Sequence, residues 1–366
     1  MKKSLLALAA MTAFTGAASA QSSVTLFGVV DLAGRAVSAG GRSQKQLVAD
    51  GFNSNRIGFR GVEDLGGGLR AGFWLEAGID PSIGTAGGGN GNAAGNAAST
   101  AAPSGSPAAF FNRRSTVSLL GGFGEVRLGR DYTPSFWNTT VFDPFGTNGV
   151  GSFLTVVDTL GTGSQTTVRA NNSVGYFLPG GLGGLYGQAM IAMGEQSIAS
   201  SLPVGNSHKS FRIGYAAGPL NVAYSWGETD NGTGGADFRH TNLGGMYDMK
   251  VVQLYAQMNN TSASGTTTVA GRKQRVTLLG ATMPMGATQL RASYIKADGS
   301  GPVAADNKDA SQISLGFVQN MSKRTALYGT YSRISNSGAG TYTLGPVAAT
   351  AGGKATGYEV GVRHSF

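Results

Sequence analysis

The chain has 366 residues, among them 60 glycines and no cysteine, and its formal net charge is +9. Glycine at this level argues against a helical protein because each one weakens a helix interior. The lack of cysteine excludes a disulfide framework and a cysteine-based zinc site. The arginines are spread singly along the sequence and do not cluster on one arm, which disfavours nucleic-acid binding.

The first twenty residues have the three parts of a secretory signal peptide. Two lysines follow the initial Met, residues 5–14 are almost wholly apolar, and residues 18–20 read Ala-Ser-Ala. The apolar run is too short to cross a bilayer as a helix. We expect residues 1–20 to be cleaved, which leaves 26 basic and 19 acidic residues, a net charge of +7, in a single domain over residues 21–366.

Alternating side chains begin soon after this segment. Residues 55–61 and 69–79 alternate with a period of two, and the stretch between them is acidic and glycine-rich. This pattern predicts two antiparallel strands joined by a short turn. The same unit recurs along the chain. The first run and the last run, residues 358–366, lack a short-turn partner, so we expect them to pair with each other and close the sheet.

Counting these runs gives about sixteen strands whose connections alternate strictly between short and long. The long connections are residues 36–54, 80–111, 130–168, 192–209, 227–238, 259–272, 297–309 and 335–354. An even strand number with this alternation is typical of an outer-membrane barrel, and closure removes the edges that lipid could not hydrate. We predict an all-β fold, a 16-stranded antiparallel transmembrane β-barrel with long extracellular loops and short periplasmic turns. A soluble secreted β-sandwich would also explain the alternation, but not the count or the rhythm.

The third long connection, residues 130–168, differs from an ordinary loop. It is rich in aromatic residues, carries few charges and contains Asp-Pro-Phe-Gly at residues 143–146. A loop of this length is usually functional or disordered, and its aromatic residues argue against disorder. We expect it to fold inward and narrow the barrel. The low-complexity connection 80–111 is instead expected to be an external loop without chemistry.

Nothing in the sequence supports an enzyme. The three histidines lie in unrelated segments, and the glycine clusters at residues 66–72 and 121–129 are flanked by strands on both sides. A phosphate-binding loop needs a helix after it. We therefore expect no catalytic residue, no cofactor and no metal.

The polar faces of the strands carry the functional signal. Their candidate lumen residues are Arg56, Arg60, Arg70, Arg114 and Arg127, with Arg130 at the entry to the third loop and with Asp131, Asp143 and Asp158 as acidic partners. A basic, water-filled wall concentrates anions, and rings of arginine favour their passage. The sequence therefore predicts weak to moderate anion selectivity.

Four blocks of sequence resemble the Gram-negative general porins, particularly those typical of β-proteobacteria. They are SSVTLFGVVDLA at residues 22–33, SNRIGFRGVEDLGGGLRAGFWLE at 54–76, NRRSTVSLLGGFGEVRLGRDYTP at 112–134 and GYEVGVRHSF at 357–366. The resemblance covers essentially the whole mature chain.

This resemblance implies a homotrimer in the outer membrane, in contact with lipid and lipopolysaccharide, with the third loop folded inside each barrel. It matches Arg56, Arg70, Arg114 and Arg130 to the family's basic cluster at the pore constriction, Asp143 to the loop carboxylate, and the terminal Phe366 to the aromatic signal that the outer-membrane assembly machinery reads.

The expected function is a water-filled channel for passive diffusion of small hydrophilic solutes and ions. Arg56→Glu or Arg130→Glu is expected to shift selectivity toward cations. Two alternatives remain open. A solute-specific channel needs a line of aromatic residues, which Phe136, Trp137, Phe142 and Phe145 could partly supply. A plugged structural or adhesive barrel would carry no conductance.

Overall fold

The structure is a computed structural model that describes residues 23–86, 110–158, 160, 166–194, 207–230, 236–264 and 271–366. The predicted signal peptide and most of the low-complexity connection lie outside these ranges. Within them, no helix has the length and apolar character needed to cross a membrane.

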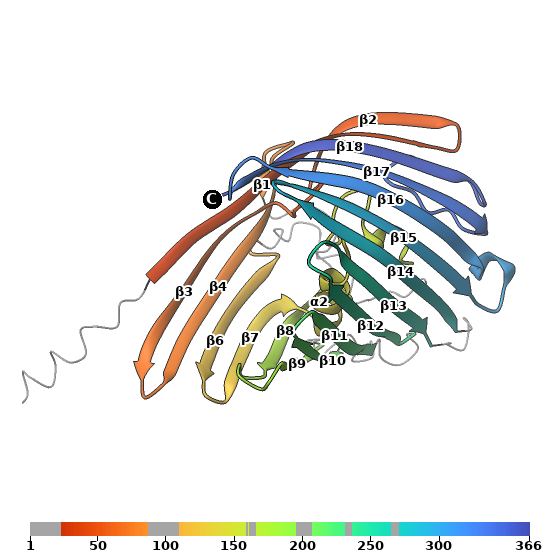
Figure 1. Ribbon diagram of the computed structural model, residues 1–366. Coiled ribbons are helices and arrows are strands. Elements are labelled where there is room, and N and C mark those ends of the chain that lie inside the picture. The colour runs from red at the N-terminus through yellow and green to blue at the C-terminus, as the bar shows by residue number, and fades with distance from the viewer. Residues whose placement is uncertain are drawn as a thin grey trace, which may run out of the picture.

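The chain forms one closed antiparallel sheet (Figure 1). Of the sheet's 18 strands, β2 (Arg42–Ala49) and β5 (Thr85–Ala86) belong to the first two long connections, which leaves sixteen in the wall. The predicted fold class is therefore confirmed. The wall strands are β1 (Ser23–Ala39), β3 (Arg56–Gly66), β4 (Leu69–Asp80), β6 (Arg114–Gly121), β7 (Gly124–Tyr132), β8 (Arg169–Phe177), β9 (Leu185–Ala192), β10 (Ser207–Ala217), β11 (Leu220–Asp230), β12 (Phe238–Asp248), β13 (Gln253–Ala263), β14 (Arg272–Met285), β15 (Thr288–Ser300), β16 (Lys308–Asn320), β17 (Thr325–Gly338) and β18 (Lys354–Ser365).

The first and last strands close the barrel, as the unpaired terminal runs predict. β1 pairs with β18 from Val29 opposite Ser365 to Ala39 opposite Ala355. The backbone of Phe366 adds one more rung, because it exchanges two hydrogen bonds of 3.1 Å with Gly28. The ring of Phe366 lies where a side chain on Gly28 would stand, 2.2 Å from the position of its Cβ. A side chain at this point of the seam would displace the Phe366 ring and would approach the carbonyl oxygen of Arg56 to 2.8 Å.

The first long connection is more regular than the sequence indicates. Only the first half of β1 pairs with β3, and β2 folds back on the second half of β1, from Leu32 opposite Ala49 to Ala39 opposite Arg42. Residues predicted as a loop thus form a hairpin with the second half of β1, alongside β18 (Figure 1).

The outward face of the wall is apolar, as the alternation predicts. Tyr224 on β11 is 39% exposed, whereas its neighbours Ala223 and Ser225 point inward and are buried. The same alternation leaves large apolar side chains exposed around the barrel, among them Leu26, Phe59, Phe73, Leu243, Leu279, Tyr294 and Val360. An exposed apolar band of this kind is the surface that lipid covers.

The third loop enters the barrel through a short helix that the sequence did not predict. Helix α2 (Pro134–Val141) begins at Thr133, whose Oγ1 accepts a hydrogen bond of 3.1 Å from the backbone N–H of Phe136. Proline suits this first turn because its fixed φ is helical and its missing N–H would be unpaired there. The helix packs inside the barrel against β10, β11 and β12 (Figure 1). The predicted inward fold is confirmed.

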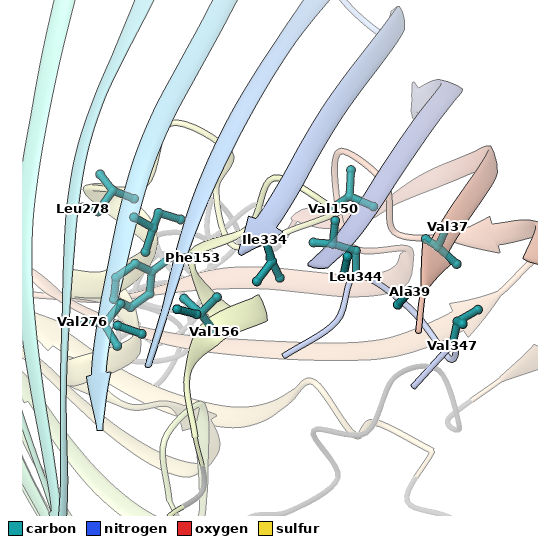
Figure 2. Close-up of a cluster of buried hydrophobic side chains, with 14 residues drawn as sticks. Val37, Ala39, Val150, Phe153, Val156, Val276, Leu278, Ile334, Leu344 and Val347 are labelled. Carbon is teal, nitrogen blue, oxygen red and sulfur yellow. The ribbon is translucent and has the colours of Figure 1, made fainter. Parts of the chain in front are cut away.

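Beyond the helix, apolar residues of the loop pack on the inner wall. Phe153 and Val156 lie near Val276 and Leu278 of β14, whereas Val150 lies beside Leu344 (Figure 2). Apart from Leu344, these side chains are at most 1% exposed, and burying each contributes about 1.5–3 kcal/mol. The cluster continues over β17, β1 and the last long connection with Ile334, Val37, Leu344 and Val347. This half of the lumen is therefore filled with protein.

Candidate channel constriction

Asp143 organises the tip of the inward loop. Its Oδ1 accepts a hydrogen bond of 2.9 Å from the N–H of Phe145, and its Oδ2 accepts bonds of 3.0 Å and 2.9 Å from the N–H groups of Thr147 and Phe153. The residue is 5% exposed, and burial raises the pKa of its carboxyl above the usual range. The loop carboxylate matched by resemblance thus holds the loop together and does not face the channel.

Three apolar residues around Asp143 dock in glycine positions of the wall. Phe142 covers Gly244 of β12, Pro144 covers Gly280 of β14, and Phe145 covers Gly316 of β16. A Cβ on Gly244 would stand 2.1 Å from the Phe142 ring, and one on Gly280 would stand 2.4 Å from Cγ of Pro144. These strand glycines therefore let the loop approach the backbone of the wall.

We expect Gly244→Ala to loosen the loop and Gly245→Ala to leave it in place. Overpacking at the first position costs about 1–3 kcal/mol, because the new methyl group would overlap the fully buried ring of Phe142. A Cβ on Gly245 would meet its nearest neighbour at 3.3 Å, on the other face of the strand. Open-channel current noise in planar bilayers compares the two variants. Equal noise in both would show that Gly244 does not seat the loop.

Polar contacts fix the remainder of the loop to the same half of the wall. Asn138 of α2 donates a hydrogen bond of 2.6 Å to Oδ1 of Asn242 on β12. The N–H of Val150 donates one of 3.2 Å to Oε1 of Glu359 on β18. Lys308 on β16 pairs with the loop's Asp158 at 2.8 Å. The loop is thus attached mainly to the strands from β10 to β18. On the other side it contacts the first long connection, where the N–H of Gly149 donates a hydrogen bond of 3.2 Å to the carbonyl of Asp50.

A first cavity of about 370 Å³ lies between the loop and the opposite wall. From the loop it is lined by Phe136, Thr147, Asn148, Gly149 and Leu154, and its charged lining residues are Arg35, Arg113, Arg169, Asp50 and Asp80. Three arginines thus face two carboxylates at the level where the loop narrows the barrel.

A second cavity of about 360 Å³ continues along the same wall toward the short turns. Arg60, Arg114 and Arg127 line it together with one carboxylate, Glu125. The basic character of the narrowing therefore extends toward the periplasmic mouth.

The buried carboxylates of this wall are each shared by two arginines. Glu76 lies 2.6 Å from Nε of Arg113 and 3.6 Å from Nη1 of Arg56. Asp131 is held in the same way by Arg127 and by Arg114, whose Nε is 3.5 Å away. Side-chain exposure is 3% for Glu76 and 2% for Asp131, against 10–24% for their four partners. The Glu76 group therefore has one excess positive charge. Arg127 also pairs with Glu125 at 2.8 Å, so in the second group the excess positive charge comes from the neighbouring Arg60. The guanidinium groups of both are nearer to solvent than the buried carboxylates.

Aromatic rings orient these arginines. The guanidinium carbon of Arg114 lies 4.5 Å from the ring of Trp74, and that of Arg169 lies 4.4 Å from the ring of Tyr132. Arg60 lies over Trp74 at 5.0 Å. A planar guanidinium stacks on a ring and keeps its N–H edges available for an anion, which a lysine cannot do in this way.

The structure brings most of the predicted lumen arginines together. Cross-strand register puts Arg56, Arg60, Arg114 and Arg127 on one inner face, and all but Arg56 line the second cavity. Arg56 contacts Glu76 behind the first cavity.

Two predicted residues are placed differently. Arg70 lies beside the short turn, opposite Asp64, and lines neither cavity. Arg130 follows a bulge at Gly129, where φ is +124°, and its side chain is held by the carbonyl of Asn112 and the amide oxygen of Asn171.

The sequence interpretation missed Arg35, Arg113 and Arg169. Arg113 lies one residue before β6, so the strand alternation did not assign its side chain to a face of the wall. Its position directly before Arg114 in the sequence was the one available signal. Arg169 begins β8 where the inward loop returns to the wall, and its Nη2 donates a hydrogen bond of 2.8 Å to the hydroxyl of Tyr132. Its position depends on the path of the loop, which no local pattern reveals.

In the part of the chain that the structure describes, no group of three or more histidine, aspartate or glutamate side chains could hold a metal ion.

Comparison with known proteins gives consistent matches. A family model described as Gram-negative porin matches residues 7–339. Outer membrane porin protein 32 of Delftia acidovorans is 39% identical over an alignment of length 381 that covers all of both chains. An outer membrane porin of Bordetella pertussis is 28% identical over an alignment of length 419, again with full coverage of both chains.

Solved structures agree with these matches. The anion-selective porin from Comamonas acidovorans is 33% identical to this chain, with a TM-score of 0.81. The match covers 94% of this chain and 100% of that porin. OmpT of Vibrio cholerae, which has also been solved in a trimer form, is 13% identical with a TM-score of 0.65 and is similar in fold alone.

Proposed function

This chain belongs to the Gram-negative porin family and is a passive outer-membrane channel, and we propose that its arginine-lined narrowing makes it selective for small anions. Its relatives are channel proteins and not enzymes. The observation that carries the proposal is the surplus of arginines on this wall, where the carboxylates Glu76, Asp131 and Glu125 lie among five arginines: Arg56, Arg60, Arg113, Arg114 and Arg127. The excess charge lies in a narrow space with low-dielectric walls, which raises the local concentration of anions.

The inward loop supplies the size limit in this proposal. It fills the side of β10 to β18 and leaves the ion path along the basic wall, where the first cavity offers about 370 Å³. Solutes would pass between the loop and the stacked arginines without a specific binding step.

A solute-specific channel is the weaker candidate. It needs a continuous line of aromatic residues along the path, yet Phe142 is 0% exposed and Phe145 is 2% exposed, because both are pressed against the wall. Of the four aromatic residues considered for such a line, Phe136 lines the first cavity.

The proposal includes the partners of the channel. We propose a homotrimer in the outer membrane of a Gram-negative bacterium, with its outer wall in contact with lipid and lipopolysaccharide. Phe366, the last rung of the closing seam, is the residue by which the assembly machinery would recognise the chain.

A liposome-swelling series tests this function. We expect neutral sugars to enter at rates that fall smoothly with size, and small organic anions to enter faster than cations of equal size. Saturation of the rate for one solute would support the solute-specific alternative. Faster entry of cations would contradict the proposed selectivity.

A further inference from the structure

A short turn at the end of the first long connection, residues 50–55, is fixed to the inside of the wall. Asp31 of β1 holds it, because its Oδ2 accepts hydrogen bonds of 2.9 Å and 2.5 Å from the N–H groups of Phe52 and Asn53. The hydroxyl of Tyr328 on β17 donates a hydrogen bond to the other oxygen of the same carboxylate. The 50–55 turn is thus attached to two strands.

The 50–55 turn and the inward loop meet at the first cavity. Besides the hydrogen bond between Gly149 and Asp50, Oγ of Ser54 donates one of 2.8 Å to Oδ1 of Asn148. All four of these residues line the cavity. A Cβ on Gly149 would stand 2.2 Å from the carbonyl oxygen of Gly51, so the two backbones are in close contact. The narrowing is therefore bounded by two segments that touch each other.

A buried arginine contacts both segments. The guanidinium carbon of Arg291 on β15 lies 4.7 Å from the ring centroid of Phe145 in the inward loop and 4.8 Å from that of Phe52 in the 50–55 turn. Its Nη1 lies 3.5 Å from the carbonyl oxygen of Pro144. Arg291 is 4% exposed, and in the described part of the chain it forms no ion pair and its Nε has no hydrogen-bond partner. The two rings are therefore its main contacts.

The charge of Arg291 also acts on the groups that hold the two segments. It interacts at longer range with the buried carboxylates of Asp143, Glu359 and Asp31. Asp143 and Glu359 accept hydrogen bonds from the inward loop, and Asp31 accepts them from the 50–55 turn. A buried charge is costly unless other charges compensate it. Arg291 and these carboxylates compensate one another without direct contact.

We propose that Arg291 is a positioning residue that couples the inward loop to the 50–55 turn and so sets the width of the narrowing. A planar guanidinium can stack on two rings at once, whereas a lysine ammonium carries the same charge without a flat face. A displacement of either ring would expose the buried cation, so the two segments keep their positions together. This inference rests on the channel function and not on the proposed anion selectivity.

Single-channel recording of Arg291→Met and Arg291→Lys in planar bilayers tests the coupling. We expect the fraction of time spent outside the main conductance level to rise about tenfold or more in both variants, because two desolvated stacking contacts are lost. A steady wild-type level in Arg291→Met would overturn the proposal. A steady level in Arg291→Lys would show that charge alone holds the segments, and would overturn the stacking role.

Arg363→Met is the matched control. The guanidinium carbon of Arg363 lies 5.4 Å from the same Phe52 ring, so the substitution removes the same charge beside the 50–55 turn and leaves the contact between Arg291 and Phe145 intact. We expect a steady conductance level. Fluctuations as large as those of Arg291→Met would assign the effect to the lost charge and would contradict the proposal.

A double-mutant cycle with Phe52→Leu tests whether Arg291 acts through this ring. Phe52→Leu alone should also increase the fluctuations, and adding it to Arg291→Met should increase them little further, because residues in contact are not additive. Additive effects would overturn the coupling. If Arg291→Met does not assemble, Arg291→Lys takes its place in the cycle. Zero-current potentials of the same channels report the proposed selectivity separately, so failure of one proposal is distinguishable from failure of the other.

Discussion

Replacing Arg60 with glutamate should shift the ion selectivity of the channel strongly toward cations. Arg60 is exposed, lines the second cavity and forms no ion pair within the described residues. The substitution changes the wall by two unit charges. One unit charge acts on an ion about 4 Å away with about 1 kcal/mol in water, so the anion-to-cation permeability ratio should fall about tenfold or more.

Arg70→Glu is the control for this prediction. Arg70 projects from the same inner face but lies opposite Asp64 at the short turn and lines neither cavity. The permeability ratio is obtained from zero-current potentials at about 0.1 M salt, where charges within about 10 Å act on a passing ion. We expect Arg70→Glu to change the ratio less than Arg60→Glu does. Equal effects of the two substitutions would mean that the overall charge of the lumen, and not the stacked arginines, sets the selectivity.

Replacing Asp143 with alanine should release the inward loop without unfolding the barrel. The substitution leaves the N–H groups of Phe145, Thr147 and Phe153 without their acceptor. Each buried donor left unpaired costs about 1–3 kcal/mol. The barrel hydrogen bonds are made between strands and do not pass through this residue. We therefore expect a larger and noisier single-channel conductance together with an intact barrel.

Asp158→Asn is the comparison for the loop. Its carboxylate pairs with Lys308, whose side chain is 39% exposed, so the pair contributes about 0–1 kcal/mol. Single-channel recording should give one steady conductance level for Asp158→Asn and fluctuating levels for Asp143→Ala. A steady wild-type level in Asp143→Ala would show that the docking of Phe142 and Phe145 holds the loop without the carboxylate.

The barrel itself could be predicted because its signal is local and repeated. Each strand alternates with a period of two, and each short turn identifies the next partner, so the closure of β1 on β18 followed from the two unpaired ends. The hairpin strand β2 was not predicted, because it pairs with the part of β1 that extends beyond β3.

The lining of the channel could be predicted only where strand alternation continued unbroken. Arg60, Arg114 and Arg127 follow the alternation and line a cavity. The bulge at Gly129 interrupts it before Arg130, and Arg113 precedes its strand. On β14 the inner face carries the apolar residues Val276 and Leu278, and the inward loop covers them. An apolar inner face on a strand therefore indicates where the loop docks. That relation needs the path of the loop in space, which the sequence does not contain.

The same difficulty explains Asp143. An acidic residue in a channel loop suggests a charge that faces the ions, and the resemblance to general porins supported that view. Its three backbone partners lie two, four and ten residues further along the chain, so the enclosure of the carboxylate depends on the folded loop as a whole. A sequence pattern does not distinguish a carboxylate that lines a channel from one that closes a turn.

The zero-current potential of the purified wild-type protein in a planar bilayer under a KCl gradient tests the central claim most directly. The surplus of arginines around Glu76, Asp131 and Glu125 predicts a stable conductance with a potential of the sign that marks chloride as the more permeant ion. A potential of the opposite sign would contradict the assignment of selectivity to the arginine wall and would leave a porin whose dominant charges lie elsewhere.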